Sequence, residues 1–315
     1  MKPFVVVSDG FDKELFEKFK KDDQFEVHPE PKISQEKLKE LLPKVEGLVI
    51  RSATTVSEEF LKDAPKLKYV IRAGEGTDNI DKLACEARGI KVSNTPGANN
   101  NSAAEHAIAL MMSVLRRTAH AHQTMSSGGW DKNKFTGVEL SEKKIGIVGF
   151  GRIGQIVARR LQGFEPEILF YDPFVEGSEL PKTKKCDDLE ILFKTCDVVT
   201  IHVPKNEKTK NMITKDQLSK MPSKSILINA SRGGIVNESD LTDILGEEKI
   251  RGAGLDVYEK EPLNENSYLR ELPNVVLTPH LGASTEEAQK RVGGMVIEQL
   301  ESYLLKDKLL NEVKA

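Results

Sequence analysis

The chain has 315 residues, which is enough for two domains of ordinary size. Its formal net charge is −3, from 46 basic and 49 acidic residues, so no overall positive field would attract nucleic acid or an anionic membrane. No apolar run approaches the roughly 18 residues of a membrane-spanning helix, and the apolar start of the chain is too short for a signal peptide. Three cysteines without metal-ligand spacing are typical of free thiols, so we expect a cytoplasmic protein without a metal site.

The first 97 residues alternate short apolar runs with amphipathic segments. This alternation predicts a parallel α/β layer. The predicted strands are Phe4–Val7, Phe25–His28, Gly47–Ile50, Tyr69–Arg72 and Lys91–Val92, and the predicted helices are Asp12–Lys20, one capped by Ser34, Ser57–Ala64 and Ile80–Arg88. The turn-rich residues 93–102 are a candidate hinge, and a long helix is predicted from Ala103 to His120.

A glycine-rich turn lies near the middle of the chain. It follows the apolar run Ile145–Val148, which predicts a buried strand, and it precedes a helical pattern. Gly149 permits a tight turn, Gly151 lets the backbone approach a pyrophosphate, and Gly154 allows close helix–strand packing. The free N–H groups at the helix start would face the phosphates. The pattern predicts a dinucleotide site, and a glycine turn kept only for packing is the alternative.

An acidic residue closes the next predicted strand, Ile168–Tyr171. This residue, Asp172, lies 18 positions after Gly154. A carboxylate at this place accepts hydrogen bonds from a ribose diol and repels a 2′-phosphate. We therefore expect NAD as the cofactor rather than NADP.

The glycine turn normally opens its domain, but here about 95 residues of α/β pattern precede it. We therefore expect two doubly wound parallel-sheet domains with a cleft between them. Residues 99–287 would form a central Rossmann cofactor domain, and residues 1–98 and 288–315 a discontinuous, flavodoxin-like substrate domain. Later predicted elements are the strands Val198–His202, Ile226–Asn229, Ile250–Val257 and Val275–Thr278 and the helix Thr285–Leu305.

Three loops that follow predicted strands carry side chains suited to catalysis, because ligands in such folds bind beyond the carboxyl ends of the strands. Arg232 is in a position to bind a carboxylate and polarise a carbonyl. His280 is a candidate general acid/base, provided that a carboxylate orients its ring. Glu259 and Glu261 are both candidates for that carboxylate, and spacing does not choose between them. Each residue taken singly could instead be an ordinary salt-bridge or core polar group.

Taken together, these features resemble the D-2-hydroxyacid dehydrogenase family, and within it the phosphoglycerate dehydrogenases. The resemblance runs nearly end to end, through Arg51–Thr54, Arg72–Asp81, Asn94–Pro96, the glycine turn and the three loops. It implies a catalytic trio. Arg232 would hold the substrate carboxylate and keto oxygen, His280 would exchange a proton with the substrate oxygen, and Glu261 would orient and charge His280.

The resemblance also implies a set of cofactor contacts around NAD. They are Gly149, Gly151, Arg152, Ile153, Gly154, Asp172, Thr95, His202, Pro204, Thr209, Ala230, Ser231, Asp256 and Gly282. Asp256 would lie near the nicotinamide amide.

Substrate contacts are implied at two places. The loop Gly74, Glu75, Gly76 would offer backbone N–H groups to the substrate carboxylate, although it could be an ordinary turn and Glu75 brings a negative charge that relatives often lack. Arg51, Arg72, Lys132 and Lys134 would bind a phosphate, with solvated surface side chains as the alternative, above all for the two lysines.

The implied activity is NAD-dependent oxidation of 3-phosphoglycerate to 3-phosphohydroxypyruvate, a step of serine biosynthesis, in a homodimer joined through Ala103–His120. Because the chain ends at 315, we expect no serine-binding regulatory domain. The alternatives are a glyoxylate/hydroxypyruvate reductase and, from another class, a non-catalytic NAD-sensing protein related to co-repressors. No nucleic-acid or membrane partner is expected.

Overall fold

The computed structural model describes residues 1–315, which divide into two compact units. Unit 1 consists of residues 1–99 and 283–315, and unit 2 consists of residues 100–282. The sequence placed the end of the cofactor domain at residue 287, but the structure ends unit 2 at residue 282. Residues 283–287 therefore belong to unit 1 rather than to the cofactor domain.

Unit 1 contains a five-stranded, all-parallel sheet with the order β2-β1-β3-β4-β5. This is the flavodoxin-like order, which confirms the predicted fold of the unit. Of its central strands, β3 is buried along its whole length, and β1 and β4 are buried at all but one residue each, so these strands are almost continuously apolar. The strands are β1 (Phe4–Val7), β2 (Glu26–Val27), β3 (Gly47–Ile50), β4 (Tyr69–Arg72) and β5 (Lys91–Asn94).

Helices cover both faces of this sheet. One core includes Leu38 of α2 and Leu61 of α3, and the other includes Phe16 of α1 and Val296 of α11. The unit has five α-helices, and each begins at a Ser, Thr or Asp whose side chain accepts a backbone hydrogen bond. The helices are α1 (Lys13–Lys20), α2 (Gln35–Leu41), α3 (Glu58–Lys62), α4 (Lys82–Ala87) and α11 (Glu286–Leu300), and a π-helical turn, Glu301–Leu305, follows α11.

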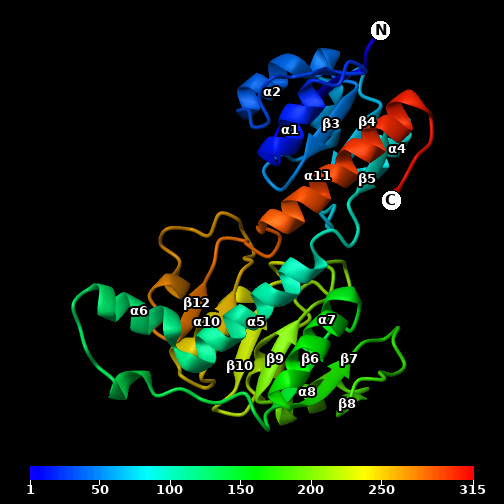
Figure 1. Cartoon of the computed structure of the whole chain (residues 1–315). Coiled ribbons are helices and arrows are strands. Elements are labelled where there is room, and N and C mark those ends of the chain that lie inside the picture. The colour runs from blue at the N-terminus through cyan, green and yellow to red at the C-terminus, as the bar shows by residue number, and fades with distance from the viewer. The chain divides into compact units, whose positions relative to one another are not determined.

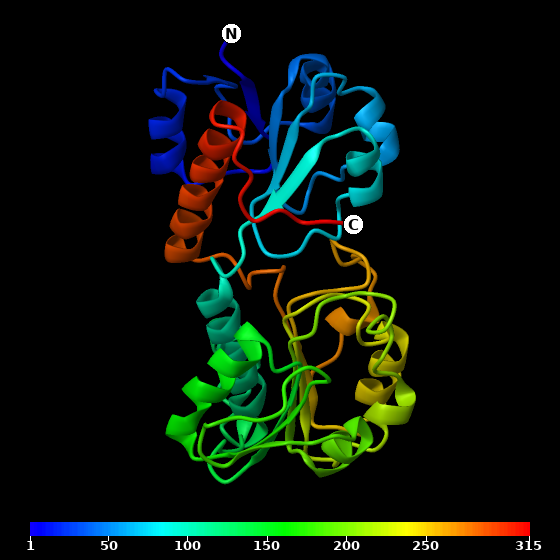
Figure 2. The same cartoon turned by 90° about the vertical axis from the view of Figure 1, so that its right-hand side faces the viewer.

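The C-terminal tail runs beside β5 (Figure 2). Ser93 and Glu312 form an antiparallel bridge, the backbone N–H of Val313 donates to Val92, and the Ser93 hydroxyl donates to Leu310 over 2.7 Å. The tail thus satisfies backbone groups that β5 would otherwise expose at the sheet edge.

Unit 2 contains a seven-stranded parallel sheet with the order β12-β11-β10-β9-β6-β7-β8. The order reverses direction between β6 and β9, which is the point where Rossmann sheets bind their dinucleotides. The strands are β6 (Lys144–Val148), β7 (Glu167–Tyr171), β8 (Thr183–Lys185), β9 (Val198–Ile201), β10 (Ile226–Asn229), β11 (Gly252–Leu255) and β12 (Val275–Leu277).

The helices of unit 2 lie on both faces of its sheet, as Figure 2 shows. Helices α5 and α7 pack on one face around Ala107 and Val157, and α8 and α10 pack on the other around Phe193 and Leu241. The helices are α5 (Asn100–Arg116), α6 (Thr118–Ser126), α7 (Arg152–Leu161), α8 (Leu189–Thr195), α9 (Lys215–Leu218) and α10 (Glu238–Gly246). None of the helices is both long and apolar enough to cross a membrane.

The predicted helix from Ala103 to His120 is wrong at both ends. Helix α5 already begins at Asn100, inside the candidate hinge, and it ends at Arg116. Arg117 has a left-handed φ of 54°, and α6 starts after it (Figure 1). The carbonyl of Leu115 accepts a hydrogen bond from Val138, so it is not available to continue the helix. No sequence pattern singled out β8, α8, α9 or α10.

Candidate active site

The glycine turn joins β6 to α7 at the switch point of the sheet. Gly149 has a φ of +92°, and a Cβ there would lie 2.6 Å from the carbonyl oxygen of His202. A Cβ on Gly154 would lie 2.2 Å from the carbonyl oxygen of Gly149. Gly151 is different, because a Cβ on it would enter open space. Two glycines thus hold the turn against the strand, while the third leaves room for a ligand at the helix start.

The start of α7 supplies donors to that space. Gly151 is its N-cap and provides no capping side chain, and the first backbone donor within the helix is Gln155. The amides of Ile153 and Gly154 precede Gln155 at this helix start, where they and the positive end of the helix dipole can meet a phosphate. These features fit a dinucleotide pyrophosphate.

Asp172 is fixed at the end of β7 by two backbone donors. Its Oδ2 accepts from the N–H of Phe150 over 2.7 Å, and its Oδ1 accepts from the N–H of Phe174 over 2.8 Å. Each carboxylate oxygen keeps a further lone pair, so the group can still accept hydrogen bonds from a ribose diol. The first bond also ties Asp172 directly to the glycine turn.

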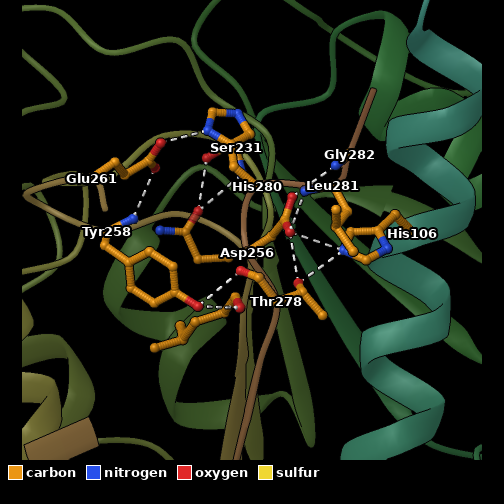
Figure 3. A network of polar contacts seen from close by, with 11 residues as sticks. His106, Ser231, Asp256, Tyr258, Glu261, Thr278, His280, Leu281 and Gly282 are labelled. Atoms are coloured by element: carbon orange, nitrogen blue, oxygen red, sulfur yellow. Dashed lines mark hydrogen bonds and ion pairs between the residues drawn. The ribbon is translucent and has the colours of Figure 1, made fainter. Parts of the chain in front are cut away.

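A histidine–carboxylate pair lies beyond the strands β11 and β12. His280 Nδ1 is 2.7 Å from Glu261 Oε2, and each side chain is about one-third exposed, at 36% and 34% (Figure 3). Nδ1 must carry a proton to donate to the carboxylate, which leaves Nε2 for proton exchange with another molecule. His280 has a left-handed φ of 56°, held by the bond of its N–H to the Asp256 carbonyl.

The choice between Glu259 and Glu261 is decided by geometry. Glu259 and Glu238 exchange hydrogen bonds with each other's backbone N–H at the start of α10, both over 3.0 Å. Glu261 instead accepts from Tyr258 N–H through one oxygen and faces His280 through the other. Burial acts to raise the pKa of Glu261, but the hydrogen bond and charge of His280 hold it below the ordinary value of 4.5.

Behind this pair lies a buried carboxylate with four donors, shown in Figure 3. The side chain of Asp256 has no exposed surface. It accepts from the Thr278 hydroxyl over 2.6 Å and from the backbone N–H groups of Leu281 and Gly282 over 2.7 and 2.9 Å. The carboxylate therefore holds the loop that carries His280 from both sides.

The fourth donor is His106, which projects from α5 and which the sequence did not single out. Its Nε2 is 3.1 Å from Asp256 Oδ1 and 3.0 Å from the Thr278 hydroxyl oxygen. Because the Thr278 hydroxyl donates to Asp256, it can only accept from His106, so the proton of His106 is on Nε2. More than 140 positions separate His106 from Asp256, and no sequence spacing indicates their contact.

The loop after β10 places Arg232. The side-chain amide of Asn229 accepts from Ser231 through its oxygen and donates to the Arg232 carbonyl, and the Arg232 guanidinium donates to the Ser231 carbonyl over 2.7 Å. A Cβ on Gly233 would lie 1.6 Å from the Tyr258 carbonyl oxygen. This close backbone approach brings the loop of Arg232 against the loop of Glu261.

Beyond β9, His202 and the turn after it reach the same edge of the sheet. The ring of His202 is 3.0 Å from the Thr200 hydroxyl, and burial lowers the pKa of His202 to about 4, so the ring is neutral near pH 7. The Thr209 hydroxyl donates to the Pro204 carbonyl over 2.6 Å and closes the turn. Ala230 and Ser231 follow β10, and Gly282 follows β12, at the same edge.

In unit 1, Arg51 is held by three neighbours. Its backbone N–H donates to Asp9 over 2.7 Å, its carbonyl accepts from Asn79, and its guanidinium donates to Gln289 over 3.0 Å. Asp9 and Gln289 were not predicted to matter, since both lie far from Arg51 in the sequence. Burial lowers the pKa of Arg51, opposed by the charge of Asp9.

Arg72, Gly74, Glu75 and Gly76 lie at the end of β4. Gly74 has a φ of +154°, and a Cβ there would collide with the Arg72 guanidinium. The carboxylate of Glu75 accepts from Gly97 N–H over 2.7 Å, and its carbonyl accepts from the Asn94 amide. Glu75 thus braces its own loop. Thr95, an expected cofactor contact, is buried in unit 1, and its hydroxyl has no hydrogen-bond partner.

Lys132 and Lys134 do not join the loops of Arg232, Glu261 and His280 in unit 2. Both are exposed, in the segment between α6 and β6. The same segment reaches the opposite edge of the sheet, where the carbonyl of Thr136 accepts a hydrogen bond from Arg251, just before β11. There the charge of Lys134 also lowers the pKa of His120. No group of three or more His, Cys, Asp or Glu side chains that could hold a metal ion is present.

Comparisons with known proteins show what the chain is similar to. Residues 108–282 match the model of the D-isomer specific 2-hydroxyacid dehydrogenase, NAD binding domain. A D-3-phosphoglycerate dehydrogenase of Archaeoglobus fulgidus is 42% identical over 297 residues, covering 94% of this chain and 56% of that protein. The chain thus spans about half the length of such relatives. A hydroxypyruvate reductase of Thermotoga maritima is 40% identical over 298 residues, covering 94% of this chain and 96% of the relative.

Solved structures show the same two-domain architecture. The TT0316 protein of Thermus thermophilus superposes with a TM-score of 0.89 at 29% identity, covering 98% of this chain and 99% of the other. A NAD-dependent formate dehydrogenase of Staphylococcus aureus, solved with NAD, superposes with a TM-score of 0.87 at 29% identity, covering 100% and 99%.

Proposed function

Because the chain belongs to the D-isomer-specific 2-hydroxyacid dehydrogenase family, we propose that it transfers a hydride reversibly between NAD and C2 of a small D-2-hydroxy acid. The observation that carries this proposal is the 2.7 Å pair of His280 and Glu261, on the same sheet edge as the glycine turn and the Arg232 loop.

Three side chains would divide the work. Arg232 binds the substrate carboxylate and polarises the carbonyl, because a guanidinium offers paired donors to planar oxygen groups. His280 gives the proton of Nε2 to the carbonyl oxygen during reduction and takes the hydroxyl proton during oxidation. Glu261 stabilises the charged ring and fixes its orientation.

The residues at the glycine turn fit the cofactor. The backbone amides at the start of α7 would bind the pyrophosphate in the space beside Gly151, and Asp172 would bind the adenosine ribose. Asp256 and its neighbours would position the loop facing the nicotinamide. When bound, NADH supplies the hydride, and every proton in the reaction is handled by the protein side chains.

For the substrate, we favour 3-phosphoglycerate, whose oxidation gives 3-phosphohydroxypyruvate and leads to serine. Arg51 and Arg72 at the carboxyl ends of β3 and β4 would bind its phosphate, and the phosphoglycerate dehydrogenases among the relatives support this choice. The cytoplasm is the compartment where such a step would take place.

One observation favours a second substrate. The Thermotoga maritima hydroxypyruvate reductase matches over nearly its whole length, whereas the matched phosphoglycerate dehydrogenases are about twice as long as the matched region. Glyoxylate/hydroxypyruvate reductase activity is therefore the alternative within the family.

NADH oxidation with 3-phosphohydroxypyruvate and with hydroxypyruvate distinguishes the two. We expect kcat/KM to favour the phosphorylated acid by about a hundredfold, roughly 2.7 kcal/mol of transition-state binding. A preference for hydroxypyruvate would assign the enzyme to the alternative. Turnover of neither acid would argue for the non-catalytic NAD sensor.

The variant Arg51→Gln tests the phosphate site directly. It should raise KM for 3-phosphohydroxypyruvate at least tenfold and leave hydroxypyruvate nearly unchanged, because only the former carries the phosphate. Arg88→Gln, which removes a charge elsewhere in unit 1, is the control. Equal effects on both substrates would contradict a phosphate-binding role for Arg51.

We also propose a homodimer joined through unit 2, which sedimentation equilibrium of the purified chain would test. Met125 of α6 and Trp130, which follows α6, are exposed, with 51% and 84% of their surface accessible, and would contribute apolar contact area.

A further inference from the structure

A recess lies at the edge of the unit 2 sheet opposite the candidate active site. It is lined by Val114 and Arg117 at the end of α5, His120 of α6, Arg251 just before β11, and Pro273, Asn274 and Val276 around the start of β12. Its empty volume is about 270 Å³, part of which opens to solvent. His280 follows the far ends of the same strands, so the recess is separate from the catalytic loops.

The charged residues of the recess all have one sign. Arg117, Arg251 and His120 line it, Lys134 is close enough to act on His120, and none of the lining residues is acidic. Arg251 donates one hydrogen bond, to the carbonyl of Thr136 over 3.1 Å. The side chain of Arg117 makes neither a hydrogen bond nor an ion pair.

Like charges that share a partly buried space oppose each other. Burial lowers the pKa of Arg251, and the charge of Arg117 lowers it further. The pKa of His120 is also lowered, first by burial and then by Arg117 and Lys134, although the ring bonds to the backbone of Val275. Such a cluster is unfavourable as long as no anion lies among its members, because a bound anion would offset the repulsion between the like charges.

Backbone groups add to the positive potential. Arg117 is the N-cap of the nine-residue helix α6 and provides no capping side chain, and the first amide to bond within the helix is that of Ala121. The positive end of the helix dipole therefore lies at the recess. Asn274 completes the lining: its amide nitrogen donates to Leu245, while its Oδ1 is buried without a partner and needs a donor such as a bound water or the proton of hydrogenphosphate.

We propose that Arg117, His120 and Arg251 form a binding site for a small oxyanion, either free phosphate or sulfate or the phosphate group of a metabolite. The guanidinium groups would supply paired donors to the oxyanion, and protonated His120 would supply a third charge. The recess and the His280–Asp256 network share elements, since α5 also carries His106, and β11 and β12 lead to Asp256 and Thr278.

Sulfate binding to the 315-residue chain tests the proposal. Sulfate is titrated against sodium chloride of equal ionic strength, with saturating NADH to fill the cofactor site, and both the thermal midpoint and the heat of binding are measured. Wild type should bind with a dissociation constant of about a millimolar and gain thermal stability. Arg117→Gln should weaken binding about tenfold, and it should fold normally because its side chain has no partner.

Arg116→Gln is the matched control, since it removes the same charge from the neighbouring exposed residue outside the recess. A wild type that responds to sulfate no more than to chloride, or an Arg117→Gln variant that binds as tightly as wild type, would overturn the proposal. Arg251→Gln should weaken sulfate binding in the same way as Arg117→Gln.

A pH series gives a second readout. The charge of sulfate is constant between about pH 5 and 8, so its affinity should fall with rising pH as His120 loses its proton. In His120→Gln this slope should disappear, and persistence of the slope would remove His120 from the site. Parallel titrations with inorganic phosphate and glycerol phosphate show whether the free ion or a phosphomonoester is preferred.

Discussion

In the candidate site, additional hydrogen bonds fix the orientation of the side chains that would take part in the chemistry. Glu261 faces His280 because its other oxygen is held by Tyr258, and Asp256 holds the His280 loop because four donors surround it. A fully buried carboxylate is tolerated only when such donors compensate its desolvation. The position of His280 therefore depends on side chains outside the His280–Glu261 pair.

His106→Leu removes one of those donors. We expect kcat for reduction to fall about tenfold with little change in KM for NADH, because the loop of His280 loses part of its support while the glycine turn is untouched. His106→Gln, whose amide can donate from a similar position, should recover most of the activity. Steady-state kinetics of both variants measure this. A purely structural role would lower the melting temperature of His106→Leu and leave kcat unchanged.

His202 makes stability depend on pH. Its folded-state pKa of about 4 lies below the ordinary value of 6.5, so the unfolded chain binds more protons between these values. Stability is complete above pH 6.5 and is lost as the pH falls toward 4. Between pH 7 and 5 the protonation of His202 should lower the free energy of unfolding by about 2 kcal/mol, and His202→Asn should remove that pH-dependent loss. Urea unfolding of both proteins at the two pH values measures the difference; equal losses would show that His202 is not responsible.

At the scale of elements, the site consists of loops that follow parallel strands and contact one another through backbone atoms. Gly149 and Gly233 mark two such contacts, with the carbonyl groups of His202 and Tyr258. These close backbone contacts set the distance between the loops, because a side chain at either glycine would push the facing loop away.

Gly233→Ala tests this spacing. Its Cβ would overlap the Tyr258 carbonyl, so the loops of Arg232 and Glu261 must separate. We expect a loss of about 1–3 kcal/mol in stability and a fall in kcat/KM of at least a hundredfold. Gly163→Ala, where a Cβ meets nothing within 4 Å, is the control. Kinetics and chemical denaturation of both variants provide the test, which wild-type activity in Gly233→Ala would contradict.

At the scale of the molecule, the chain leaves unit 1 after residue 99 and returns to it at residue 283. The returning helix α11 buries Val292, Val296 and Leu300 against one face of the unit 1 sheet. Without it, this apolar face would meet water, at a cost of about 25 cal/mol for each Å².

A chain ending at residue 282 should therefore lose cooperative folding of unit 1 and keep that of unit 2. Hydrogen exchange of the shortened chain measures it: amides of β1–β5 should exchange rapidly, and those of β6–β12 should stay protected. Unchanged protection of β1–β5 would show that α11 is dispensable for unit 1.

Local patterns in the sequence predicted much of this fold. Buried parallel strands are apolar along their length, and Ser34, Ser57 and Thr285 mark helix starts by capping them, so both are visible within a few residues. The strand orders of both sheets agree with the predicted flavodoxin-like and Rossmann classes. The break at Arg117 was missed, because the bond from Val138 that ends α5 comes from 23 positions beyond Leu115.

The sequence by itself determined the fold class, the glycine turn with Asp172, and the three loops that carry Arg232, Glu261 and His280. It did so because turn geometry, helix capping and strand burial are governed by neighbouring residues. The resemblance implied Glu261, but only the tertiary structure showed that Glu261 rather than Glu259 faces His280. Only the tertiary structure joined His106 to Asp256 and placed Thr136 against Arg251 on the far edge of the sheet. Those contacts join residues that are distant along the chain, and packing across the sheet alone brings them together.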